Sequence, residues 1–182
     1  MVLVIVSGPS GVGKDRLIRV AQEKDPSIGI VTPYTTRPRR RTETEGYDYL
    51  FVTRDAFRLS ISKGFFFDWD YTLGNYYGCR REEMMSAATE VRPVFMHALA
   101  RMAIRIAGRL PGTRLVYMRP RNYDLLSSRL MERGYSADEI VERTAHWREE
   151  DEHSSLFDVI VDSAEALSQG DVSSIVDRIR KG

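Results

Sequence analysis

Cysteine, long apolar runs and a strong excess of one charge are all missing from this sequence. Cys79 is the single cysteine in 182 residues, so no disulfide can form within the chain, and no cluster of cysteines and histidines predicts a zinc site. The 27 basic and 26 acidic side chains nearly cancel, which argues against a surface whose main work is to bind nucleic acid. Any basic chemistry must therefore be local.

The apolar run near the start of the chain, Val2 to Val6, is far too short for a membrane span or a secretory signal. We therefore expect a cytoplasmic protein that has no membrane among its partners. A chain of 182 residues can bury one substantial core but is too short for two ordinary domains. We expect one domain, acting as a monomer or a homodimer.

In the second half of the chain, short apolar segments alternate with helical ones, a pattern typical of a parallel sheet covered by helices on both faces. We therefore predict an α/β fold. The expected strands are 29–32, 64–71, 92–97, 113–118 and 159–161, and the expected helices are 54–63, 81–89, 99–108, 123–133, 137–154 and 172–180. The segment 73–79 is predicted as a turn-rich aromatic stretch.

The segment GPSGVGKD, from Gly8 to Asp15, lies between the first apolar run and a helix expected to end near Asp25. This spacing and context fit the phosphate-binding pattern G-x-x-x-x-G-K-[ST], in which backbone N–H groups converge on an anion at a helix N-terminus. A tight strand-to-helix turn without a ligand is the plainer alternative. The residues expected to bind nucleotide phosphate are Gly8, Ser10, Gly11, Val12, Gly13, Lys14 and Asp15.

Between Thr35 and Val52 the sequence is first basic, then acidic, then aromatic, with four arginines in the five positions 37–41. Arginine forks match the geometry of phosphate oxygens, although a solvated or ion-paired loop would have a similar sequence. The stretch 64–79 places Asp68 and Asn75 among aromatic residues, a set that suits a planar polar ring. A small aromatic core is the alternative for that stretch.

A third charged segment, residues 129–148, carries arginines at positions 129, 133, 143 and 148. Its place late in the chain fits a flap that closes over a site. A pair of exposed helices with Glu–Arg contacts is the alternative interpretation.

Four motifs in this order make the chain resemble the guanylate kinase family over nearly its whole length: GPSGVGKD, TTRPRRRTETEGYDYLFV, FDWDYTLGNYYG, and RLMERGYSADEIVER followed by FDVIVD. The resemblance implies a P-loop three-layer α/β/α fold with a parallel core sheet, an insertion that binds the acceptor nucleotide and an arginine-bearing lid. The expected core comprises residues 1–32, 81–132 and 155–182, the insertion residues 33–80, and the lid residues 133–154.

The same resemblance implies a kinase that moves the γ-phosphoryl group of ATP to GMP with Mg²⁺, so its partners are small-molecule nucleotides. Lys14, Arg133 and Arg143 match the catalytic residues of the family. The residues that match its acceptor site are Arg37, Arg40, Tyr49, Asp68, Tyr77 and Cys79. Asp68 falls where the family has a glutamate that reads guanine, and a carboxylate can accept from two adjacent donors there that adenine lacks.

The chain also departs from the family within the site. Asp15 replaces the P-loop hydroxyl, and Pro33 and Cys79 replace acceptor-site serines. The strand 94–98 lacks the family's acidic residues, and its His97 is interpreted as a core histidine rather than a catalytic one. We hypothesise that Asp15 holds Mg²⁺, directly or through water, in place of the missing strand carboxylate.

Two other functions stay open from the sequence. The GKD ending of the P-loop, Tyr34 and the non-acidic strand also resemble ribose 1,5-bisphosphate phosphokinases, although the GYDY and FDW segments favour a nucleotide. Altered metal ligands are also compatible with a guanylate-kinase-like module that only binds proteins, but such a module would not need Lys14 and the arginines. A nucleoside monophosphate kinase, most simply GMP to GDP, is the prediction.

Overall fold

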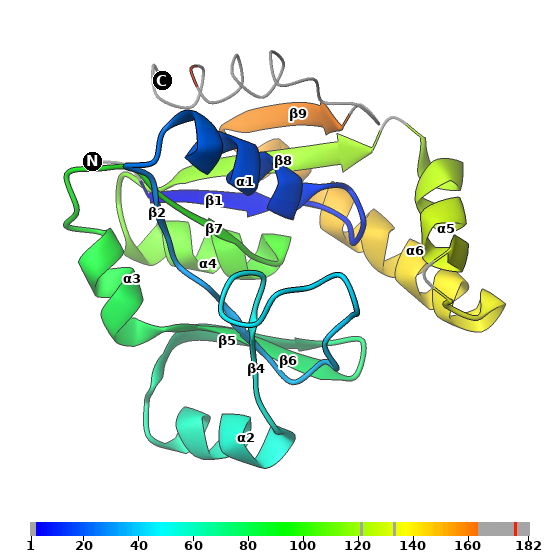
Figure 1. Ribbon diagram of the computed structural model, residues 1–182, viewed down its shortest axis with the longest axis horizontal. Coiled ribbons are helices and arrows are strands. Elements are labelled where there is room, and N and C mark those ends of the chain that lie inside the picture. The colour runs from blue at the N-terminus through cyan, green and yellow to red at the C-terminus, as the bar shows by residue number, and fades with distance from the viewer. Residues whose placement is uncertain (1–2, 121, 133, 164–176, 178–182) are drawn as a thin grey trace.

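Two separate β-sheets organise the protein, whose computed structural model describes residues 3–120, 122–132, 134–163 and 177 (Figure 1). The larger sheet is parallel throughout and has the strand order β2-β7-β1-β8-β9. Its strands are β1 (Leu3–Ser7), β2 (Gly29–Ile30), β7 (Val94–His97), β8 (Arg114–Pro120) and β9 (Val159–Ser163). The predicted parallel sheet is therefore confirmed.

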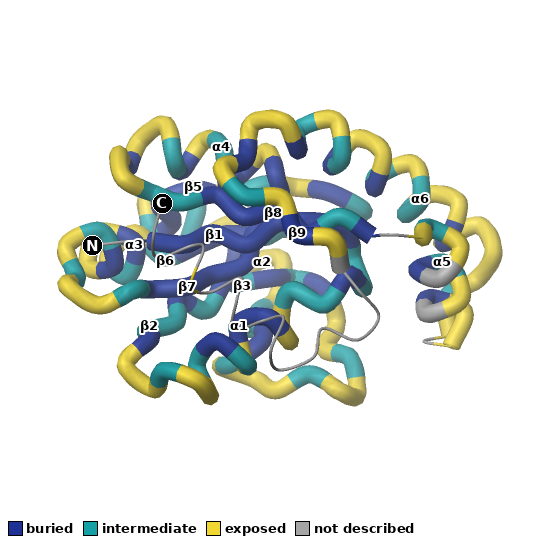
Figure 2. Tube along the Cα trace, turned by 90° about the horizontal axis from the view of Figure 1, so that it is seen from above, coloured by how far each residue is buried: buried dark blue, intermediate teal, exposed yellow. Residues whose placement is uncertain are grey.

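β1 lies at the centre of this sheet, and all five of its residues are buried. Its side chains alternate between two cores, because Ile5 packs with α4 (Ala100–Arg109) whereas Val4 and Val6 pack with α1 (Lys14–Lys24). Figure 2 shows α1 and α4 on opposite sides of the buried strands. A strand covered on both faces needs a continuous apolar run, and the result is the predicted three-layer α/β/α fold.

The second sheet is built from residues 34–80 and has the strand order β4-β3-β6-β5. Its strands are β3 (Tyr34–Thr35), β4 (Leu50–Phe51), β5 (Phe66–Thr72) and β6 (Asn75–Arg80). α2 (Arg54–Ser62) covers this sheet through Phe57, whose ring stacks on those of Phe66 and Tyr76 with centroid distances of 4.2 and 5.2 Å.

β5 and β6 form a hairpin, which corrects the prediction of a turn-rich segment over 73–79. Thr72 pairs with Asn75, so Leu73 and Gly74 make the whole connection. Both residues have positive φ, 46° and 72°, as a two-residue type I′ turn requires. Leucine is rarely found in that conformation, so the usual Asn-Gly or Asp-Gly signal is absent and the second strand is hidden from sequence analysis.

The remaining helices are α3 (Arg81–Ala87), α5 (Tyr123–Glu132) and α6 (Ala137–Glu152), followed by a short 3₁₀ helix (Ser154–Leu156). α5 and α6 pack on each other at one end of the core sheet (Figure 1) and share a small apolar cluster made by Leu126, Leu130, Ile140 and Trp147. In the described part of the chain, no helix is both long and apolar enough to cross a membrane. The helix predicted over 172–180 lies outside the described residues apart from Asp177.

Candidate active site

The loop between β1 and α1 lies at the carboxyl edge of the core sheet, where parallel α/β proteins bind their ligands. Gly8 has φ of 136°, and a Cβ added there would lie 2.3 Å from the Met118 carbonyl oxygen, so glycine is required for the loop to pass β8 this closely. Gly13 is the N-cap of α1 in a left-handed conformation, and no side chain caps the helix there. The first N–H groups of α1 can therefore bind an anion.

Lys14 bends over this loop. Its Nζ donates to the carbonyl oxygens of Gly8 at 2.6 Å and Pro9 at 3.0 Å. Val12 packs its side chain in the core with α1, so it could contact a phosphate through its backbone only. The loop thus places a positive charge and backbone donors on one side of the site, as the P-loop pattern predicts.

A cleft of about 400 Å³ opens beside the loop, a volume typical of small-molecule sites. Its walls come from the P-loop, the second sheet and its connecting loop, the end of β7, and α6. The predicted site residues that line it are Gly8, Ser10, Gly11, Gly13, Lys14, Asp15, Arg37, Arg40, Tyr49, Tyr77 and Arg143. The structure therefore brings most of the predicted set together around one space.

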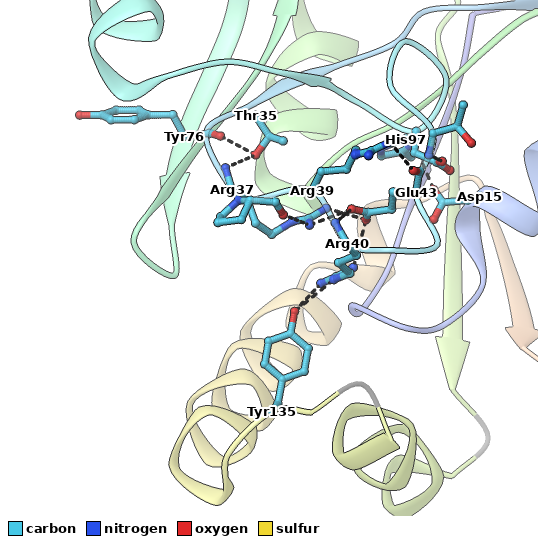
Figure 3. Close-up of polar contacts among 12 residues, drawn as sticks. Asp15, Thr35, Arg37, Arg39, Arg40, Glu43, Tyr76, His97 and Tyr135 are labelled. Atoms are coloured by element: carbon cyan, nitrogen blue, oxygen red, sulfur yellow. Dashed lines mark hydrogen bonds and ion pairs between the residues drawn. The ribbon is translucent and has the colours of Figure 1, made fainter.

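Arg37 and Arg40 converge on the carboxylate of Glu43, as Figure 3 shows. The Arg37 guanidinium donates to the two Glu43 oxygens at 2.7 and 3.0 Å, and the Arg40 backbone N–H donates at 2.8 Å. Burial raises the pKa of the Glu43 carboxyl, but hydrogen bonds from both arginines more than offset this and hold the pKa below its ordinary value. Arginine side chains bind carboxylate and phosphate groups with similar geometry. The Glu43 carboxylate therefore occupies a position where a phosphate could bind.

The arginine clamp, Arg37 and Arg40, also reaches Tyr135, which lies just before α6. Nε and Nη2 of Arg40 donate to the Tyr135 hydroxyl at 3.1 and 2.9 Å (Figure 3). The Arg143 guanidinium lies 4.2 Å from the centroid of the Tyr135 ring, a cation–π contact. The other predicted lid arginine, Arg133, lies outside the described residues. Sequence reasoning misses both Glu43 and Tyr135, because nothing but the fold brings them to the arginines.

Tyr49 connects the clamp to the core sheet. Its ring lies 5.3 Å from the Arg37 guanidinium carbon, and its centroid is 6.0 Å from that of Tyr77 and 4.7 Å from that of His97. Burial raises the pKa of the Tyr49 hydroxyl, so this group stays protonated and able to donate a hydrogen bond.

His97 is buried, as expected of a core histidine, and it also lines the cleft. Its Nδ1 lies 3.5 Å from the Asp15 carboxylate, while its Nε2 is buried and has no hydrogen-bond partner among the described residues. Burial lowers the pKa of the imidazole, against the opposing effect of Asp15, so the ring is neutral at pH 7. A buried polar atom without a hydrogen-bond partner lowers the free energy of unfolding by about 1–3 kcal/mol, so Nε2 of His97 carries a cost in stability.

Asp68 and Cys79 were expected to contact the acceptor, and the structure does not place either of them in the cleft lining. Arg105 of α4 donates to Asp68 Oδ1 from Nη2 at 2.6 Å and from Nε at 3.1 Å, and Arg109 Nη1 donates to Oδ2 at 3.3 Å. Cys79 pairs opposite Asp68 and is fully buried in the core cluster that includes α4. Burial raises the pKa of its thiol to about 12.

Asp68 was assigned to the acceptor site from the family resemblance alone, which does not show which face of the sheet it occupies. The pairing of β5 with β6 shifts register between Phe66 and Asp68, and a bulge of this kind changes the face that the following side chains occupy. Asp68 consequently meets the arginines of α4 instead of the cleft.

Glu150 of α6 is a cleft residue that sequence reasoning also misses. It is 5% exposed, and its two carboxylate oxygens accept from the Ala100 backbone N–H at 3.0 and 3.2 Å. Burial raises the pKa of its carboxyl to about 6, although Lys14 acts in the opposite direction. Glu150 therefore caps the first turn of α4 and ties α6 to the core.

The phosphate-binding loop and its lysine face the arginine clamp across a cleft at the edge of a parallel sheet. This arrangement defines a P-loop kinase. The family comparison is more specific, because the family model described as guanylate kinase matches residues 1–169. The chain belongs to the guanylate kinase family, which confirms the resemblance of its motifs.

The similar proteins agree with this assignment. The guanylate kinase of Gloeobacter violaceus is 34% identical over 157 residues, which cover 86% of this chain and 77% of the relative. That of Idiomarina loihiensis is 35% identical over 162 residues, covering 87% and 77%. Among solved structures, guanylate kinase from Anaplasma phagocytophilum has a TM-score of 0.73 at 21% identity, covering 98% of this chain and 82% of that one.

Shikimate kinase from Bacteroides thetaiotaomicron is a more distant structural neighbour. It has a TM-score of 0.53 at 15% identity and covers 99% of this chain and 96% of its own. Likeness at this level shows the shared P-loop kinase fold alone.

Proposed function

We propose that this protein transfers the γ-phosphoryl group of ATP to the phosphate of GMP, giving ADP and GDP. One observation carries the proposal: the P-loop and the arginine clamp line the same cleft. A phosphate oxygen of GMP attacks the γ-phosphorus while the bond to the bridging oxygen of ADP breaks. Because the attacking oxygen is already ionised, the task of the protein is to position the phosphates and to stabilise their charge.

The donor side of the site uses Lys14 and the amides of the loop. When ATP binds, the Lys14 ammonium exchanges its carbonyl partners for outer phosphate oxygens, and the N-terminus of α1 adds a favourable dipole. Asp15 fits the role of a Mg²⁺ ligand, since its carboxylate lines the cleft and Mg²⁺ in kinases is commonly held by one or two carboxylates together with substrate phosphates. When bound, Mg²⁺ would neutralise charge on the β- and γ-phosphates.

The acceptor side uses the arginine clamp. The GMP phosphate takes positions beside Arg37 and Arg40, where two or three of its oxygens replace or share the hydrogen bonds now made to Glu43. Tyr49 and Tyr77 line the same cleft, and we propose that their hydroxyls donate to the same phosphate.

The lid supplies the remaining charge. In the proposed division, residues 1–32, 81–132 and 155–182 form the core, 33–80 the acceptor-binding insertion and 133–154 the lid. Arg143 and Arg133 then stabilise the transferred phosphoryl group, a contribution that arginine fingers make worth about 10³–10⁵ in rate. Closure of the lid also keeps water from the γ-phosphate.

The test is an ADP-release assay with ATP and Mg²⁺ against GMP, dGMP, AMP, CMP, UMP and ribose 1,5-bisphosphate. We expect GMP to be turned over best, and removal of Mg²⁺ with a chelator to abolish turnover. Lys14→Met should lower kcat by about 10²–10³-fold, while Lys63→Met, at an exposed lysine of α2's C-cap, should match the unaltered protein. Turnover of the sugar bisphosphate alone, or of no acceptor, would overturn the proposal.

A further inference from the structure

Tyr135 contacts two arginines to which the proposed function gives different phosphates. Its hydroxyl oxygen accepts from Nε and Nη2 of Arg40 at 3.1 and 2.9 Å, as Figure 3 shows. Its ring lies under the guanidinium of Arg143, whose central carbon is 4.2 Å from the ring centroid. One side chain therefore connects the arginine clamp with the lid arginine.

The backbone of Tyr135 is held on both sides. Gly134 has φ of 82°, and its N–H donates to the Met131 carbonyl oxygen at 2.9 Å. The Tyr135 N–H donates to the Leu130 carbonyl oxygen at 3.2 Å. These two hydrogen bonds are those of the Schellman motif, which ends α5. Ser136 then begins α6 with a capping box, so the ends of two helices restrict the backbone between them.

The ring of Tyr135 is held as well. It packs against the apolar cluster that α5 and α6 share. Tyr135 directly precedes the N-cap of α6, and Ile140 of the cluster follows the N-cap by four residues, which is the spacing of a hydrophobic staple. A ring fixed in this way can hold other side chains in place.

The hydroxyl of Tyr135 sets the direction of the Arg40 guanidinium. An arginine side chain has five N–H donors. Among the described residues, Arg40 uses two of them on Tyr135 and one on Glu43, whose Oε1 lies 3.3 Å from Nη1. One N–H remains on each terminal nitrogen, and such a pair can bind a phosphate. The phenol thus limits the rotation of Arg40 and leaves donors for a ligand.

The ring of Tyr135 acts in the same way on Arg143. The Nε of Arg143 is buried and has no hydrogen-bond partner in the described part of the chain. The negative face of the aromatic ring attracts the guanidinium and orients it without using any of its N–H donors. Arg143 lines the cleft, so these donors stay available to a phosphoryl group.

We propose that Tyr135 is a positioning residue for phosphoryl transfer, whose hydroxyl orients Arg40 for the acceptor phosphate and whose ring orients Arg143 for the transferred phosphoryl group. The inference rests on the proposed function, because Tyr135 acts there through the two arginines and does not itself line the cleft. With the lid on the clamp, as in this structure, both charges are oriented before the phosphates arrive. Orientation in advance lowers the cost of binding and of reaching the transition state.

Two variants separate the hydroxyl from the ring. Tyr135→Phe removes the oxygen alone, so we expect the KM for GMP, and the Kd for GMP without ATP, to rise about three- to tenfold, the cost of immobilising one long side chain. The kcat and the KM for ATP should stay within about twofold. Tyr135→Leu keeps an apolar contact with the cluster but removes the ring, so kcat should also fall about tenfold, as expected for a lost cation–π contact.

Double variants show which arginine each part of Tyr135 acts through. Tyr135→Phe should leave the KM for GMP unchanged in an Arg40→Met background, because the hydroxyl has lost its partner. Tyr135→Leu should leave kcat unchanged in an Arg143→Met background for the same reason. Effects that add in either cycle would overturn the proposal.

Tyr123→Phe and Tyr123→Leu are the matched controls. Tyr123 packs against the same apolar cluster and lies outside the cleft lining, so its variants report the effect of packing alone. Both should keep kcat and the KM for GMP within about twofold, and thermal melting verifies that every variant is folded. A fall in kcat as large in Tyr123→Leu as in Tyr135→Leu would assign the effect to packing and overturn the proposal.

Failure of this inference and failure of the proposed function give different results. An unchanged KM for GMP in Tyr135→Phe, or an unchanged kcat in Tyr135→Leu, would overturn the role of Tyr135 while GMP turnover by the unaltered protein persists. Absence of GMP turnover in the unaltered protein would instead overturn the proposed function.

Discussion

The second sheet carries two arginine–carboxylate clusters that differ in what their arginines face. The cleft cluster consists of Arg37, Arg40 and Glu43 and lines the site. The α4 cluster consists of Asp68 and Asp70 with Arg105 and Arg109, and it joins β5 to α4 outside that cleft. Similar ion pairs thus line the candidate site in one cluster and attach β5 to α4 in the other. Which face a residue occupies, rather than its type, decides its role.

The largest difference between the clusters should appear in acceptor binding. Arg40→Met removes a fork from the cleft cluster, and a charge-assisted pair of hydrogen bonds to phosphate is worth roughly 3 kcal/mol, or about 10²-fold in kcat/KM for GMP. The melting temperature should change less than the kinetics, because Glu43 keeps its two hydrogen bonds from the Arg37 guanidinium and the one from the backbone N–H of residue 40. Steady-state kinetics with GMP and ATP varied in turn checks this, and an ATP effect as large as the GMP effect would contradict it.

The matched change in the α4 cluster should act on stability instead. Arg105→Met leaves Asp68 with Arg109 as its remaining guanidinium partner, so we expect a loss of about 1–3 kcal/mol in the free energy of unfolding. The KM for GMP should stay within about twofold. Urea denaturation and kinetics on the same preparation measure both quantities. If KM rose tenfold without loss of stability, the distinction between the clusters would fail.

Glu150 differs from the carboxylates of both clusters because its buried carboxylate accepts from a backbone N–H, that of Ala100, and not from an arginine. Its pKa rises from 4.5 to about 6 on folding, so the stabilisation from its proton is complete below pH 4.5 and is lost as the pH rises through 6. Glu150→Gln avoids this loss and should be more stable than the unaltered protein by up to about 2 kcal/mol at pH 7.5.

The pH dependence is the decisive part of that experiment. The stability difference between Glu150→Gln and the unaltered ligand-free protein should fall toward zero at pH 4. Denaturation curves at several pH values measure it. A difference that does not vary with pH would mean that the carboxyl is not desolvated in the folded state.

The smallest expected effect concerns base selectivity. Asp68→Asn should leave the preference for GMP over AMP within about twofold, because the Asp68 carboxylate binds Arg105 and Arg109 rather than lining the cleft. Competition between the two nucleotides in one assay measures the preference. Loss of selectivity in this variant would restore Asp68 as the base-reading residue.

Sequence analysis succeeded where local pattern and chemistry coincide. The apolar run of β1, the glycine loop and the start of α1 follow one another in the chain, so their spacing alone predicts a parallel core and a phosphate site. The arginines at 37 and 40 were recognisable because their motif is local as well.

The sequence did not predict contacts between residues that lie far apart in the chain. Asp68 meets Arg105 across a bulged hairpin, and Glu150 meets the start of α4. The unusual Leu73–Gly74 turn concealed the strand that completes the hairpin. Facing and pairing of this kind depend on register and on the packing of helices, neither of which is encoded in a short motif.

A nucleotide has to enter and leave the cleft, so one of its walls has to move. The α4 cluster opposes movement of the second sheet. Swinging the second sheet away from α4 would strip Asp68 of two guanidinium partners at once, an opening with a high free-energy cost. The opposite wall, α6, is held by fewer contacts of this kind. Glu150 attaches it to α4 near its C-terminal end, and Tyr135, just before the helix begins, contacts the arginine clamp. We therefore expect the second sheet to stay attached to α4, and α6 to move, when substrates enter and products leave the cleft.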